Sequence, residues 1–219
     1  SGAIAVAPAS LAFGNAVVGS SADLDLTVTN PGTGSLTVTG ITSDDPQFWA
    51  SPVSFSVPAG GNRAVTVTFA PSATGAQTGN LSIAHNAVGS PKVVPVAGAG
   101  TAPVFAVAPG VLAYGDVAIG SPAVLSFTVS NPGTASLDVA SVTSNNGQFV
   151  PDISSFSVGP GGSQIVNITF TPSAEGLRSG TVTLVHTAPG SPSTVPVNGT
   201  GTSPGFALTP GGLNFGSVV

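Results

Sequence analysis

The sequence contains no cysteine, no methionine and very little charge. Without cysteine the chain can form neither a disulfide bond nor a thiolate metal site. Only 5% of the 219 residues are charged, whereas about a quarter is usual for a globular protein. The strong helix formers glutamate, lysine, arginine, methionine and glutamine are scarce, which favours an all-β fold over a helical one.

Basic side chains are especially few: Arg63, Lys92 and Arg178 stand against eight acids, for a net charge of −5. A nucleic-acid-binding surface needs several cations to neutralise phosphates, and attachment to anionic lipid needs a basic cluster. The sequence also has no apolar run long enough to span a membrane. We therefore expect neither nucleic acid nor membrane insertion among the interactions of this segment.

What the sequence does contain is a repeat. Shifting the chain by 101 residues superposes it on itself without a gap, and the superposed residues include Phe13 and Tyr114, Phe48 and Phe149, Phe69 and Phe170, His85 and His186, and the Asn-Pro-Gly-Thr motifs at 30–33 and 131–134. A period of 101 is too long for a solenoid unit, so each copy is a domain of its own. We predict domains at 1–101 and 102–202, with 203–219 as the first strand or strands of a third repeat.

Each copy shows short alternating segments separated by turn signals, which is typical of a β-sandwich. In the first copy Leu24, Leu26 and Val28 alternate with polar residues, and the turn motif at 30–33 follows. The prolines Pro95 and Pro196 predict an edge strand or a bulge near the end of each copy. The short proline-containing junctions predict tandem immunoglobulin-like sandwiches placed end to end, a rod of roughly 70–90 Å for two domains.

The third copy offers a possible assembly strand. Its apolar residues are Phe206, Leu208, Leu213 and Phe215. Two interpretations stay open: a longer array is truncated here, or this strand pairs with a neighbouring molecule.

The motifs themselves resemble a known family. They are a Leu-x-Phe-Gly segment starting at Leu11, the Thr-Asn-Pro-Gly-Thr turn, a Val-x-Phe-x-Pro-x-x-x-Gly segment and a closing Val-x-Gly-x-Gly-Thr. This succession resembles the ASH or Hydin-like immunoglobulin-like domains, which are related in fold to major sperm protein and to the periplasmic pilus chaperones. In bacteria such repeats occur in long choice-of-anchor surface proteins. The resemblance implies a structural and interaction module with no catalytic residues.

Asp44 and Asp45 form the one acidic pair, so they are the candidate metal ligands. Calcium needs six to eight oxygens, and the second copy has Asn145 and Asn146 at these positions. The alternative is that the pair caps or solvates a loop. We expect no cofactor.

No catalytic arrangement is expected either. His85 and His186 lie one per domain, so a structural role near the end of a strand is the favoured interpretation. No Gly-x-Ser-x-Gly elbow occurs. Trp49 could be either a core residue or an exposed anchor. The second copy has Val150 at this position, which favours a packing role of low specificity.

Three functions fit these observations. The first is a structural stalk or filament segment of a bacterial extracellular or cell-surface protein, whose partners are neighbouring copies of the same repeat. The second is an adhesin-type module that binds protein or glycan through end loops or a sheet edge. The third is an accessory region of a larger secreted enzyme. The segment itself is expected not to be an enzyme.

Overall fold

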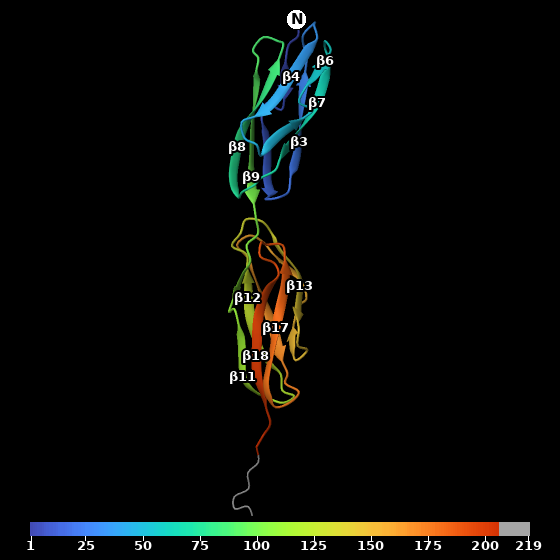
Figure 1. Ribbon diagram of the computed structural model, residues 1–219. Helices are drawn as coiled ribbons and strands as arrows, with labels where there is room; N and C mark the ends of the chain where they lie inside the picture. The colour runs from blue at the N-terminus through green and yellow to red at the C-terminus, as the bar shows by residue number, and fades with distance from the viewer. Residues whose placement is uncertain (206–219) are drawn as a thin grey trace, which may run out of the picture. The chain divides into compact units, whose positions relative to one another are not determined.

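The computed structural model describes residues 1–205, and all regular structure in this range is β-strand (Figure 1). The strands form two units. The first holds residues 1–102 together with 133–135, and the second holds the other described residues from Pro103 onward. No helix able to cross a membrane occurs in the described range. The expected all-β, immunoglobulin-like sandwich is confirmed in both repeats, which place their strands in the same order.

The first repeat has a four-stranded sheet facing a five-stranded sheet. The four-stranded sheet has the order β1-β3-β7-β5, and the five-stranded sheet has the order β2-β9-β8-β4-β6. The strands are β1 (Ala5–Ala7), β2 (Leu11–Val17), β3 (Ala22–Thr29), β4 (Leu36–Ser43), β5 (Phe48–Ser51), β6 (Phe55–Val57), β7 (Asn62–Phe69), β8 (Gly75–His85) and β9 (Lys92–Thr101).

The second repeat has the corresponding sheets, in the orders β10-β12-β16-β14 and β11-β18-β17-β13-β15. Its strands are β10 (Ala106–Ala108), β11 (Leu112–Ala118), β12 (Ala123–Ser130), β13 (Leu137–Ser144), β14 (Phe149–Pro151), β15 (Phe156–Val158), β16 (Ser163–Phe170), β17 (Gly176–His186) and β18 (Ser193–Thr202).

The opening segment of each repeat changes sheets. In the first repeat β1 pairs with β3, whereas β2 crosses to the other sheet and runs parallel to β9. The β2–β9 register shifts between Ala12 and Asn15, and Gly14 lies in this shift with φ +67°. A side chain is rarely found in that left-handed conformation, which explains the glycine of the Leu-x-Phe-Gly motif.

The expectation that Pro95 marks an edge strand is wrong. β9 lies between β2 and β8, in the interior of its sheet. Pairing with β2 begins only at Val96, opposite Leu11, so Pro95 lies where β9 has a single neighbour. The missing N–H of the proline therefore costs no hydrogen bond to β2.

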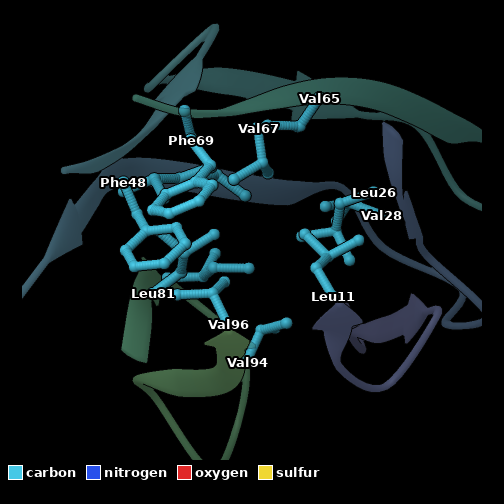
Figure 2. Packing of buried hydrophobic residues seen from close by; sticks show 14 of the residues in the cluster. Leu11, Leu26, Val28, Phe48, Val65, Val67, Phe69, Leu81, Val94 and Val96 are labelled. Carbon is cyan, nitrogen blue, oxygen red and sulfur yellow. The ribbon is translucent and has the colours of Figure 1, made fainter. Parts of the chain in front are cut away.

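Alternating side chains from both sheets meet in one core per repeat. Figure 2 shows Val67 and Phe69 on one side and Leu81, Val94 and Val96 on the other, pointing toward each other. These five side chains are buried completely or almost completely. Burying each such side chain contributes about 1.5–3 kcal/mol to folding.

Three aromatic rings occupy one end of each core. In the first repeat Phe48 stacks on Phe69 with ring centroids 4.6 Å apart, and Phe13 packs against both rings at 5.7 and 5.6 Å. A Cβ on Gly98 would overlap the Phe69 ring, which explains the first glycine of the closing motif. The second repeat forms the same cluster from Tyr114, Phe149 and Phe170.

A buried asparagine joins the segments at the other end of the first repeat. Asn30 is 0% exposed, and its side-chain nitrogen donates to the carbonyl oxygens of Gly34 and Val57 at 2.8 and 3.0 Å. Its side-chain oxygen accepts from the backbone N–H groups of Ala3 and Gly32 at 3.1 and 3.0 Å. One carboxamide therefore fixes the segment before β1, the turn after β3 and the end of β6.

The second repeat reuses this arrangement. Asn131 is also fully buried, donates to the carbonyl of Val158 at 3.0 Å and accepts from the N–H of Val104 at 3.1 Å. The sequence motif predicted only a turn here; the structure shows that its asparagine also joins the segment before β10 to the end of β15.

Replacing Asn30 with alanine should destabilise the first repeat by about 3 kcal/mol, because one buried and three partly buried backbone groups lose their partner. Urea unfolding followed by Trp49 fluorescence measures this, since the only tryptophan lies in the first repeat. Asn15→Ala, at an exposed position, is the control and should stay within about 0.5 kcal/mol of the parent chain. Equal effects of the two substitutions would contradict the proposed attachment role.

Candidate functional site

The candidate metal pair lies in the loop that leads from β4 to β5. This loop forms one wall of an open groove of about 710 Å³, whose other walls are residues 10–12, 78–80 and 95–97 of β2, β8 and β9 and their flanks. A Cβ on Gly79 would lie 2.9 Å from the Asp44 carboxylate, so a glycine in β8 allows the loop to approach the sheet.

The Asp44 carboxylate is occupied by protein donors. Its two oxygens accept from the backbone N–H and the side-chain nitrogen of Asn80, at 2.6 and 2.9 Å. These hydrogen bonds, that of the Asn80 side chain first, lower the pKa of Asp44 below its ordinary value. Asp44 is therefore held in its charged form as a cap on β8.

Asp45 acts within its own loop. One of its carboxylate oxygens accepts from the backbone N–H of Gln47 at 2.9 Å, and its backbone carbonyl accepts from the Ser43 hydroxyl at 2.8 Å. Both aspartates thus have local hydrogen-bonding roles.

The second repeat keeps these roles without the charges. The side-chain oxygen of Asn145 accepts from the N–H of Thr181 at 2.8 Å, and that of Asn146 accepts from the N–H of Gln148 at 3.0 Å. An amide oxygen replaces a carboxylate oxygen in each hydrogen bond. In addition, residues 1–205 contain no group of three or more histidine, cysteine, aspartate or glutamate side chains able to hold a metal ion. The geometry favours the loop-capping interpretation of Asp44 and Asp45.

The two histidines lie in equivalent core positions. His85 is 7% exposed; its Nδ1 accepts from the N–H of Ala87 at 3.2 Å, and its buried Nε2 has no hydrogen-bond partner in the described part of the chain. His186 stacks on Phe105 with ring centroids 4.2 Å apart, and its Nε2 lies 3.0 Å from the Ser193 hydroxyl. Burial lowers the pKa of both imidazoles below the ordinary value of 6.5.

The contact between Ser193 and His186 resembles half of a nucleophile–base pair. However, the His186 ring is 7% exposed and is covered by the Phe105 ring, so a substrate could not reach it. The first repeat has Lys92 at the position of Ser193, which shows that the hydroxyl is not needed for the fold. A structural role fits both histidines.

The interpretation of Trp49 as a packing residue is wrong. Trp49 lies on β5 between the buried residues Phe48 and Ala50, so its indole points to the outside of the sandwich and is 46% exposed. The sequence did not predict β5 or β14 as strands. Strands of three or four residues contain too few alternations to be recognised against loop residues. The possible assembly residues Phe206, Leu208, Leu213 and Phe215 lie outside the described residues.

Millimolar calcium should leave the urea midpoint of the first repeat unchanged, because the Asp44 and Asp45 oxygens already accept hydrogen bonds. Trp49 fluorescence reports that midpoint. Asp44→Asn copies the second repeat and is the matched control. Stabilisation by calcium of the parent chain, but not of Asp44→Asn, would show that a metal site exists.

Mild acid should destabilise both repeats. Because the folded chain holds His85 and His186 neutral, the unfolded chain binds more protons once the pH falls below about 6.5. Stability should therefore be nearly constant above about pH 7 and should decrease between about pH 6.5 and pH 5. Urea midpoints across this range measure the effect. The double variant His85→Gln, His186→Gln should lose less stability than the parent chain, and an equal loss would exclude the histidines as the cause.

A family model matches each of the two repeats. The ASH model, described as "Abnormal spindle-like microcephaly-assoc'd, ASPM-SPD-2-Hydin", matches residues 3–93 and again 100–194. A search of curated proteins gives no significant match.

Solved structures with similar chains come from bacteria and eukaryotes. A Porphyromonas gingivalis W83 protein of unknown function is 18% identical, with 90% of this chain and 99% of that chain covered and a TM-score of 0.40. The ASH/PapD-like domain of human CEP192, PapD-like domain 7, is 17% identical over 44% of this chain and 84% of that chain, with a TM-score of 0.40. The CupB2 chaperone of Pseudomonas aeruginosa is 13% identical over 88% and 98%, with a TM-score of 0.36. Because the family model covers most of both repeats, the chain belongs to the ASH domain family and carries two tandem copies of the domain.

Proposed function

We propose that this chain is a non-catalytic stalk or filament segment of a bacterial extracellular or cell-surface protein. The observation that carries the proposal is the parallel pairing of the second and last strands of each repeat. β2 and β9 run parallel and end together, with Val17 beside Thr101. The chain begins at the other end, where the Ser1 carbonyl accepts from the N–H of Gly34. A repeat that the chain enters at one end and leaves at the other is suited to act as a spacer within a stalk or filament.

The sheet edges support a spacer that does not associate sideways. The edge strands β1, β5 and β6 have only three, four and three residues. The longer edge strand β2 is interrupted by the register shift around Gly14. Short or bulged edges offer few consecutive free backbone groups to a strand from another molecule.

The surface composition supports the same role. Serine, threonine, alanine and glycine dominate the exposed positions, and only 5% of all residues are charged. Long-range electrostatic attraction to other macromolecules is weak for such a surface.

A second candidate, a protein- or glycan-binding module, is favoured by one observation, the exposed indole of Trp49.

Chains containing one, two and three copies of residues 1–202 test the spacer. Their maximum dimension in small-angle X-ray scattering should increase by a constant step of about 70–90 Å per copy. Inserting a flexible Gly-Ser segment after Thr101 is the control and should make the steps smaller and unequal. A parent series without constant steps would contradict the spacer role.

Protease added to intact producing cells should cleave the segment, and full protection would contradict the surface location.

A further inference from the structure

The outward side of the four-stranded sheet in the first repeat carries an unusual group of side chains. β3, β7 and β5 place two rows of directly opposed residues there. We define the Trp49 face as the six residues of these rows: Asp23, Thr68 and Trp49 in one row, and Asp25, Thr66 and Ser51 in the other.

The indole of this face has no partner in the described chain. Trp49 is 46% exposed, and no aromatic ring or cation within residues 1–205 contacts it. Tryptophan is one of the side chains enriched at the energetic centres of protein interfaces.

The two carboxylates of this face lie on β3, on the far side of β7 from the indole, and carry uncompensated charge. The Asp23 side chain is exposed, and its carboxylate has neither a hydrogen bond nor an ion pair with any described residue. Asp25 accepts a single hydrogen bond, from the Thr66 hydroxyl at 3.2 Å. Arg63 occurs on β7 in register with Val28, at a position whose side chain alternates to the opposite side of the sheet from Thr66. The face is therefore negative and lacks a neutralising cation.

The second repeat shows what the same sheet looks like without this group. Val124, Ser126 and Val150 replace Asp23, Asp25 and Trp49. The one acid on that side, Asp152, has both oxygens occupied by the backbone and side-chain nitrogens of Asn167, at 2.9 and 2.7 Å. The shared fold thus does not require the aromatic ring or the free carboxylates, so they are not explained by packing.

We propose that the Trp49 face binds a segment of a partner protein that carries arginine or lysine side chains. A cation over the indole face gains a cation–π interaction, and further cations of the same segment can pair with the carboxylates of β3, two strands away. Asp23 and Asp25 are two residues apart on β3, a spacing of about 6.6–6.8 Å, which equals the spacing of alternate side chains in an extended peptide. A neutral glycan could stack on Trp49 and donate hydroxyl hydrogen bonds to the carboxylates, but it carries no positive charge to compensate theirs. The inference does not depend on the stalk role.

The single tryptophan of the chain makes the binding directly measurable. Titration with the peptide acetyl-Arg-Ser-Arg-Ser-Arg-amide should change Trp49 fluorescence to saturation, and added salt should weaken the binding because exposed charges are screened. The controls are the same peptide with glutamate in place of arginine, and neutral maltohexaose. Absence of saturable binding of the arginine peptide at millimolar concentration would overturn the proposal, as would tighter binding of the neutral sugar.

Substitutions taken from the second repeat separate binding from folding. We expect the affinity for the arginine peptide, measured by titration calorimetry, to fall about two- to fivefold in each of the variants Asp23→Val, Asp25→Ser and Trp49→Val. Their unfolding midpoints should stay close to that of the parent chain. The reverse triple variant Val124→Asp, Ser126→Asp, Val150→Trp should add a second binding site per chain. Unchanged affinity in all three single variants would overturn the proposal, and a stoichiometry that stays at one in a folded triple variant would do the same.

Discussion

Both repeats depend on one buried carboxamide. Asn30 has every hydrogen-bonding position of its side chain filled by backbone groups, and those groups come from segments of both sheets. A buried amide left without partners costs about 1–3 kcal/mol per group, so only the correct placement of the opening segment, the turn and the end of β6 satisfies it. Asn131 imposes the same condition on the second repeat. Hydrophobic burial stabilises the sandwich, and this amide selects how its ends are joined.

Much of the fold could be predicted from the sequence, because alternation and repetition are local signals. The pattern of Leu24 to Val28 predicts β3, and the 101-residue shift transfers that prediction to β12. Sheet membership could not be predicted in the same way. The opening segment is divided between two sheets at residues 8–10. Pro95 is tolerated inside a sheet because the pairing of β9 with β2 begins only at the next residue, Val96. Both facts depend on partners far away in the sequence.

The candidate site shows the same division. Sequence reasoning could name Asp44 and weigh a metal against a cap, but the answer depends on Asn80, which lies 36 residues away and reaches the carboxylate only in the folded sheet. For Trp49 the sequence allowed a core residue or an exposed anchor and favoured packing because of Val150, since a strand this short shows too little alternation to decide. The exposed indole and the carboxylates of β3 become neighbours only through β7, which is paired with both strands. The order of residues along the sequence therefore does not show that Trp49 and the β3 carboxylates share one face.

The parallel pairing of β2 with the last strand, β9, has a mechanical consequence. A pulling force applied at the two ends of the first repeat would act along β2 and β9, and would load their hydrogen bonds together in shear. A hairpin pulled from its two adjacent ends would instead open one bond at a time. Gly98 and Gly100 allow β9 to pack closely against Phe69 and the Ala73 carbonyl. Each repeat thus places a parallel strand pair, loaded in shear, between the points where tension would enter and leave.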